Sequence, residues 1–336
     1  MAYSSTIEEL NMRHAIIDSH ATKLNDILRK LSRERLNRMA GDYRVAGRSK
    51  MNKEALAEAL CDSILDKDRM RKTLLSITSE EDKLVNRLAE AECVQGPSLI
   101  PGSYLYLMDN GLLYSFYDQE SLVYVIPEDI KNPYREIWKQ PSFREEWNRR
   151  NIVLRYIEAA VHLYGICPMD KLIEIYNEQQ DRPITEREMF RMLIDLLDRP
   201  SSWSFSQNCF ISDYFEDSLD EQVALLRRTE GKPYYIPEQA ELLRYSSSDY
   251  FEKTPQLERL KSYILRKLCK DATIAEYVVD DIQLACSMEA PLKDIIYELE
   301  RRDILFSSME QAKDVVALIV DVYNHTVMVQ SRLHAG

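Results

Sequence analysis

Basic side chains gather between residues 23 and 53 of a chain whose formal net charge is −12. Ten Lys and Arg residues lie there beside only three carboxylates, so the segment is opposite in charge to the rest of the protein. Such side chains, together with backbone N–H groups at a helix start, form a suitable cradle for phosphate. We therefore predict backbone contacts to DNA or RNA, with low sequence specificity, from Arg29, Lys30, Arg33, Arg35, Arg38, Arg44, Arg48, Lys50 and Lys53.

Other interpretations of this charge distribution stay open. Charged residues on short helices are commonly solvent-exposed without binding a ligand. The basic segment would also suit an acidic protein partner, which would make the chain an interaction adaptor that binds no nucleic acid. The acidic remainder would equally allow a surface that imitates DNA and inhibits a DNA-binding protein.

Residues for catalysis or metal binding do not occur in recognisable patterns. The sequence contains no GxxxxGK[ST], GxGxxG, HExxH or GxSxG motif. Its five histidines and six cysteines are not spaced as metal ligands or redox pairs. We therefore predict a protein that is not an enzyme, with no catalytic residue, no metal site and no cofactor.

The overall composition predicts a folded cytoplasmic protein. Hydrophobic residues make up 45% and charged residues 30% of the chain, as in ordinary globular proteins. No apolar run is long enough to cross a membrane, and the acidic residues among the first twenty do not suit a signal peptide. We therefore expect no membrane association. The six cysteines are placed singly along the chain, which fits a reducing compartment such as the cytoplasm.

The N-terminal region reads as helices separated by a loop. An apolar stripe predicts a helix over residues 7–31, and Ser32 is placed to cap a shorter helix that ends near Ala40. Gly41 and Gly47 interrupt the helical periodicity, and Asn52 begins another helix. The segment therefore predicts a helix–loop–helix unit with its basic residues around the loop.

This stretch resembles the N-terminal module of the Rho termination factor, which is related in shape to SAP domains. The matching features are Leu31 and Leu36 before the loop, the run VAGRSKMNKEAL across it, and the apolar residues of the following helix. The resemblance implies nucleic-acid binding through the loop and the start of the second helix. The corresponding basic positions are Arg44, Arg48, Lys50 and Lys53.

Two later segments each predict helices followed by a β-hairpin, which is the order of a winged helix. In the first, Ser79 is placed to cap a helix, and strands are expected over residues 112–117 and 122–126, before a connector with two prolines. In the second, Thr185 and Glu188 form a capping box, and a hairpin is expected within residues 201–215. The apolar residues of the capped helix are expected to face inward: Met189, Phe190, Leu193, Leu196 and Leu197.

The fold class that follows is mainly α with small β-hairpins. We expect an N-terminal helix with a SAP-like module over residues 1–64, winged-helix-like units over 65–137 and 148–245, and a C-terminal helical domain over 250–336. The later part of the chain contains the runs LYGICPMDKLIEIYNEQ, GKPYYIPEQAELLRYSSSDYFEKTPQ and YNHTVMVQSRLHAG. In these runs, from about Tyr164 onward, it resembles proteins of low-GC Gram-positive bacteria and their mobile elements. Some of those carry a cysteine-rich SEC-C tail, which is not found here. This resemblance implies a fold and a bacterial setting, and would suit a regulator of transcription or of a mobile element.

The third helix of a winged helix often enters the major groove of DNA. In the second unit that helix carries Arg187 and Arg191, which are secondary candidates for nucleic-acid contact, but acidic residues outnumber them. The first unit offers no basic residue on its corresponding helix. We therefore expect both units to serve structure, protein binding or self-association instead of reading DNA.

Overall fold

The fold is described from a computed structural model, which covers residues 10–95, 99, 103–197, 199, 201–215, 218–229, 234–247, 250, 253–287, 290–302 and 304–326. The chain is mainly helical with two small β-sheets, which confirms the predicted fold class. It divides into two compact units. Unit 1 comprises Met1–Val153 and Ile194–Pro200, and unit 2 comprises Leu154–Leu193 and Ser201–Gly336. The finer division into four domains stays a prediction.

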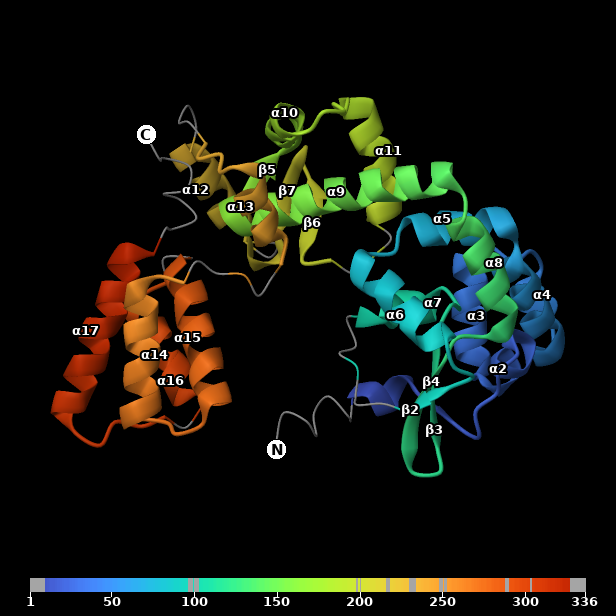
Figure 1. Ribbon diagram of the computed structural model, residues 1–336, viewed down its shortest axis with the longest axis horizontal. Coiled ribbons are helices and arrows are strands. Elements are labelled where there is room, and N and C mark those ends of the chain that lie inside the picture. The colour runs from blue at the N-terminus through green and yellow to red at the C-terminus, as the bar shows by residue number, and fades with distance from the viewer. Residues whose placement is uncertain are drawn as a thin grey trace. The chain divides into compact units, whose positions relative to one another are not determined.

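Unit 1 combines short helices with a four-stranded sheet (Figure 1). Its helices are α2 (Leu24–Lys30), α3 (Arg33–Asp42), η1 (Arg48–Lys50), α4 (Lys53–Leu65), α5 (Lys67–Leu75), α6 (Ser79–Ala89), α7 (Leu105–Asp109), α8 (Glu128–Trp138) and the first part of α9 (Pro141–Tyr164). Its strands are β1 (Ile16–Ile17), β2 (Val94–Gln95), β3 (Tyr114–Asp118) and β4 (Ser121–Val125). The connector expected after β4 is wrong, because α8 and the start of α9 occupy that segment.

The single helix predicted over residues 7–31 is also wrong. A helical turn covers residues 10–14, β1 pairs in parallel with β3, and α2 begins only at Leu24. Between β1 and the start of α2, backbone N–H groups donate to carboxylates of distant segments. The His20 N–H donates to Asp118 over 3.0 Å, and the Leu24 N–H donates to Asp129 over 2.8 Å. These tertiary bonds replace the intrahelical bonds that a continuous helix would make.

The predicted helix starts are mostly confirmed. Ser32 accepts a hydrogen bond from the Arg35 N–H at the start of α3, and Asn52 accepts one from the Ala55 N–H at the start of α4. The cap of α6 is displaced by one residue from the prediction, because Thr78 and Glu81 form a reciprocal capping box there. Local side-chain chemistry therefore sets these boundaries.

The hairpin of β3 and β4 is confirmed, with its strands shifted by one or two residues. The strands are joined by Gln119 and Glu120, which both have positive φ, as the tight turn of a two-residue hairpin requires. The strand order is β1-β3-β4-β2. The sheet thus adds a parallel strand from the N-terminal segment to the expected hairpin.

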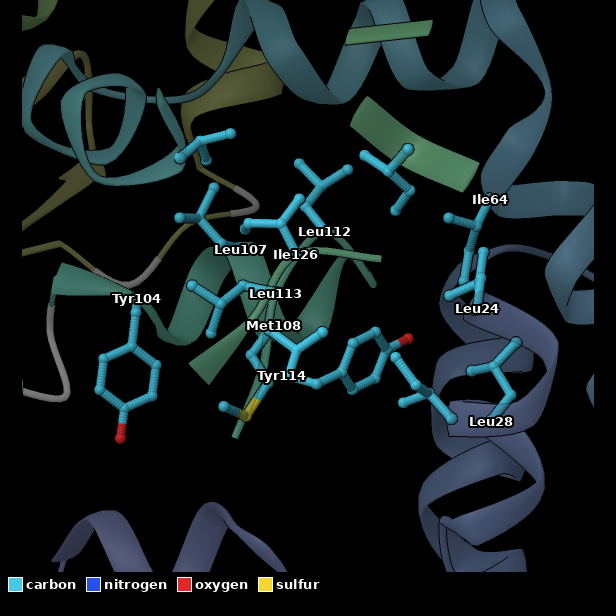
Figure 2. Packing of buried hydrophobic residues seen from close by; sticks show 14 of the residues in the cluster. Leu24, Leu28, Ile64, Tyr104, Leu107, Met108, Leu112, Leu113, Tyr114 and Ile126 are labelled. Atoms are coloured by element: carbon cyan, nitrogen blue, oxygen red, sulfur yellow. The ribbon is translucent and has the colours of Figure 1, made fainter. Parts of the chain in front are cut away.

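One apolar core joins the N-terminal helices to this sheet. Figure 2 shows Leu24 and Leu28 of α2 and Ile64 of α4 beside Tyr114 of β3. All four side chains are almost completely buried. The helix–loop–helix segment is therefore packed on the hairpin as part of unit 1.

Unit 2 begins with three helices and a three-stranded sheet. The remainder of α9 is followed by β5 (Ile166–Pro168), α10 (Met169–Gln179), α11 (Glu186–Leu196), β6 (Trp203–Ser206) and β7 (Cys209–Ser212), with the strand order β5-β7-β6. The capping box of Thr185 and Glu188 at the start of α11 is confirmed. Further short elements follow: η3 (Asp213–Phe215), α12 (Leu219–Thr229), α13 (Gln239–Leu242) and η4 (Leu243–Ser246).

The inward orientation predicted for the apolar residues of α11 is only partly correct. Met189, Leu193 and Leu196 are buried, whereas Phe190 and Leu197 are exposed. A helix of this length turns only part of its circumference to the core, so a run of adjacent apolar residues cannot all be buried on one side.

The C-terminal region is a group of four helices that lie side by side in Figure 1. They are α14 (Pro255–Lys267), α15 (Ala272–Ser287), α16 (Leu292–Glu300) and α17 (Met309–His325). Thr254 caps α14, and Ser308 caps α17. Their apolar faces meet in a separate core that includes Leu260, Val278, Ile295 and Ile319. The predicted C-terminal helices are thereby confirmed.

Candidate functional site

A cleft in unit 1 brings together basic side chains from distant parts of the chain. It encloses ≈ 1400 Å³, and its walls come from the turn at residues 10–14, from α3 and the loop after it, from α5, from α7, and from the last turn of α11 with the residues that follow it. Its basic residues are Arg13, Arg35, Arg38, Arg44, Arg69, Lys72 and Arg199. Its carboxylates are Glu34, Asp42, Asp109 and Asp195, so cationic groups are in excess.

Arg35 is a partly buried cation of this cleft. Its guanidinium donates a hydrogen bond to the carbonyl oxygen of His14 over 3.0 Å. Burial lowers the pKa of Arg35, yet an arginine stays protonated at any physiological pH. Burial and, next, the Arg35 charge lower the pKa of His14. His14 is therefore neutral at pH 7, and Arg35 supplies the fixed charge.

Arg44 stands where the chain leaves α3. The Val45 N–H donates to the Ala40 carbonyl over 2.8 Å and the Arg44 N–H donates to the Gly41 carbonyl over 2.9 Å, which is the Schellman pattern of a helix end. Arg44 has a φ of 52°, a left-handed conformation that usually belongs to glycine at this position. The backbone thus holds the Arg44 side chain, which is exposed, at the cleft.

Replacing Arg44 with glycine is expected to stabilise unit 1 by about 1 kcal/mol, because glycine adopts a positive φ without steric strain. Urea unfolding of the full chain measures this change. Arg44→Ala removes the same charge but keeps the strained conformation, so its free energy of unfolding is expected to stay near that of the original protein. Equal stability of the two variants would contradict the prediction.

The carboxylate of Asp195 is neutralised within unit 1. Arg150 donates to it over 2.7 Å, and Lys72 lies 3.3 Å away. Glu146 links the same Arg150 to Arg71, with N–O distances of 3.6 and 3.0 Å. This ion-pair network removes one negative charge from the cleft wall and fixes the end of α11 to α5 and α9.

Arg199 follows α11 in the chain, and several partners hold its side chain. It pairs with Glu81 at 3.0 and 3.1 Å, donates to the Ser76 carbonyl over 2.6 Å and lies 4.1 Å from the centre of the Tyr106 ring. These contacts attach the Arg199 guanidinium to α6 and α7, so this side chain stabilises the wall of the cleft.

The structure separates the nine predicted binding residues. Arg35, Arg38 and Arg44 line the cleft. Arg29 pairs with Glu58 and Lys30 with Asp18, each at 2.8 Å. Those two cations are therefore neutralised by the protein's own carboxylates.

The other four predicted residues lie on the loop between α3 and α4 or beside it. Arg33 donates to the Met51 carbonyl over 2.7 Å. The Arg48 guanidinium lies over Gly41, where an added Cβ would come within 3.0 Å of it. Lys50 ends η1 and Lys53 begins α4, and neither side chain lines the cleft. Whether any of the nine binds nucleic acid stays a prediction.

Four basic residues of the cleft were missed from the sequence: Arg13, Arg69, Lys72 and Arg199. The run DRMRK in α5 was a usable signal for two of them, since it places Arg69 and Lys72 three residues apart on one helix face. Nothing local marks Arg199, which reaches the cleft only through the fold.

Metal and membrane chemistry find no support in the described residues. No group of three or more His, Cys, Asp or Glu side chains lies close enough to hold a metal ion within the part of the chain that the structure describes. Among the described helices, none combines the length and apolarity needed to cross a bilayer.

No protein-family model, curated protein or solved structure matches this chain. The similarities to the Rho module and to Gram-positive proteins stay predictions from short motifs.

Proposed function

We propose that unit 1 binds the sugar–phosphate backbone of a nucleic acid in the arginine cleft, and that the protein acts as a non-enzymatic recruitment factor. One observation carries this proposal. Arg13, Arg35, Arg44 and Arg69 line a single cleft, and none of them has a carboxylate within 4.0 Å among the described residues. In an acidic chain, four such cations on one concave surface favour a polyanionic ligand.

The carboxylates of the cleft do not cancel this charge. Asp195 is neutralised by Arg150 and Lys72, and the Arg38 guanidinium lies 3.8 Å from Asp109. Glu34 and Asp42 remain, and they lie on the exposed side of α3. The arginines therefore keep a net attraction for phosphate.

Binding through these groups would be modest and salt-dependent. If about four arginines each neutralise one phosphate, log K falls with log salt at a slope of roughly −3 to −4. Phosphate contacts fix position on the strand but do not distinguish bases. Specificity for a target would then come from another surface of the protein or from a partner.

The test measures fluorescence anisotropy of labelled single-stranded DNA, RNA and duplex DNA at about 50 and about 200 mM salt. In the variant Arg13→Glu/Arg44→Glu the affinity for at least one of these ligands is expected to fall about 30-fold, and the salt slope to become shallower by about 2. Both side chains are exposed, so the fold is expected to tolerate the change.

The matched control is Lys50→Glu/Lys53→Glu, which changes the charge equally on the same basic stretch but outside the cleft. Less than threefold loss is expected for it. A greater loss in the control than in the cleft variant would place binding on the SAP-like loop. No salt-dependent binding by the original protein would remove the proposal and favour the adaptor function.

A further inference from the structure

Helix α16 in the C-terminal part of unit 2 keeps a large aromatic side chain in the solvent. Its core-facing residues Ile295 and Leu299 are completely buried, whereas Tyr297, which lies between them in sequence, is 56% exposed. The helix packs beside α15 (Figure 1). Tyrosine is enriched at protein interfaces because its ring offers apolar contact area and its hydroxyl a hydrogen bond.

The exposed face of α15 continues this surface. Tyr277 is 44% and Leu284 37% exposed, and with Asp281 they are spaced at i, i+4 and i+7 along one side of the helix. The Asp281 carboxylate lies 3.0 Å from the Arg301 guanidinium at the end of α16, so the two faces adjoin. We call Tyr277, Leu284 and Tyr297 the tyrosine patch. Large side chains that stay exposed together are typical of a surface that binds another molecule.

The charges around Tyr297 alternate in sign. Lys293 and Glu300 lie on one side of Tyr297, one helical turn before it and one after it. Asp294 and Arg301 lie on its other side in the same way. Lys293, Asp294 and Glu300 are exposed, and none of them has an ion pair among the described residues. Each side of the face therefore carries one positive and one negative charge, in opposite order along the helix.

This pattern is complementary to itself. When a second α16 lies antiparallel on the first, two-fold symmetry places Lys293 opposite Glu300 of the second copy. The same symmetry places Asp294 opposite Arg301 of the second copy. Antiparallel helix dipoles also attract each other. A partner of uniform charge would instead meet repulsion at two of the four positions, so the charges favour another copy of this chain.

We infer that the tyrosine patch is a homodimer interface, in which α16 packs antiparallel on α16 of a second copy. The Tyr297 rings meet near the two-fold axis, and Tyr277 and Leu284 of α15 extend the contact on each side. All of these residues belong to unit 2, and the inference is independent of the proposed function of the cleft.

The expected dimer is weak, because α16 has only nine residues and is about 14 Å long. A contact of this size is at the lower end of specific interfaces, and a dissociation constant of about 1–100 μM is expected for it. The dimer would double the number of clefts that one assembly presents to a ligand.

Sedimentation equilibrium of the full chain at about 1–200 μM measures this association. The variant Tyr297→Glu is expected to dimerise at least about tenfold more weakly, since it removes the ring and buries a charge at the axis. Glutamate is a good helix former and the position is exposed, so the fold is expected to be kept. The matched control is Tyr214→Glu, at a tyrosine of η3 that is 51% exposed, and its dimerisation is expected to be unchanged.

A charge-exchange experiment tests the antiparallel arrangement. Lys293→Glu and Glu300→Lys each place like charges opposite one another, and each variant alone is expected to dimerise about tenfold more weakly. An equimolar mixture of the two variants is expected to regain the original affinity, because every reversed charge then meets its complement in the other variant. Local damage to α16 would not be repaired by mixing.

Three results would overturn the inference. The original protein could stay monomeric at the highest concentration, which would leave the tyrosine patch to a different protein partner. Tyr297→Glu could dimerise as tightly as the original protein, which would place the interface elsewhere. A mixture of Lys293→Glu and Glu300→Lys that dimerises no better than either variant alone would contradict the antiparallel pairing of α16.

Discussion

Replacing Arg199 with alanine is expected to lower the free energy of unfolding of unit 1 by about 3–5 kcal/mol, the largest effect that we predict for one substitution. The side chains of Arg199 and Glu81 are 10% and 3% exposed, and they lie 3.0 Å apart. Without the guanidinium, the Glu81 carboxylate stays buried, and among the described residues its remaining hydrogen bond comes from the Thr78 N–H. An unpaired buried charge is strongly destabilising.

Urea unfolding in a Trp203→Phe background measures this loss, because the remaining tryptophans, Trp138 and Trp147, both lie in unit 1. The double variant Arg199→Met/Glu81→Gln is expected to recover part of the stability, since it removes both charges together. Arg29→Ala breaks an exposed pair with Glu58 in unit 1 and serves as the control, with an expected cost below about 1 kcal/mol. A similar small cost for Arg199→Ala would show that water reaches Glu81.

The second large effect is expected for Gly111→Ala, at the end of α7. Gly111 has a φ of 69°, and an added Cβ would lie 2.6 Å from the Ile64 side chain and 3.1 Å from the Tyr114 hydroxyl. The left-handed conformation costs about 1 kcal/mol for alanine, and the overpacked core costs about 1–3 kcal/mol more. The total expected loss is therefore about 2–4 kcal/mol.

Gly47→Ala separates the two causes. Gly47 has nearly the same φ, 71°, but no atom lies within 4 Å of an added Cβ. Only the conformational cost of about 1 kcal/mol is expected there. Both variants are compared by urea unfolding in the Trp203→Phe background. Equal losses at the two glycines would mean that Ile64 moves aside freely, and would contradict the tight packing of α4 against the end of α7.

Local chemistry in the sequence predicted much of the fold. Ser32, Asn52 and the Thr185–Glu188 pair act within one turn of their own helices, so their effect is readable without tertiary information. The N-terminal helix was mispredicted because its interruption depends on Asp118, nearly one hundred residues away. The apolar periodicity of the sequence continues across that interruption, so the pattern does not indicate where the helix breaks.

The candidate site was harder to predict, because charge density along the chain differs from charge density in space. Arg29 lies in the basic run, but its guanidinium pairs with Glu58 of α4. Arg13 and Arg199 lie outside the run and still reach the cleft. The basic run of the sequence therefore includes three residues of the cleft lining, Arg35, Arg38 and Arg44, but it does not reveal which cations the fold neutralises.

The pairing of Glu81 with Arg199 has a consequence for how the chain folds during its synthesis. Residues up to Val153 are synthesised before Arg199. Until Arg199 has been added to the chain, the Glu81 carboxylate has no counterion. At ordinary elongation rates the delay lasts roughly 2–10 s. An N-terminal fragment that ends near Val153 is therefore expected to mature incompletely, and a self-sufficient version must extend through Pro200.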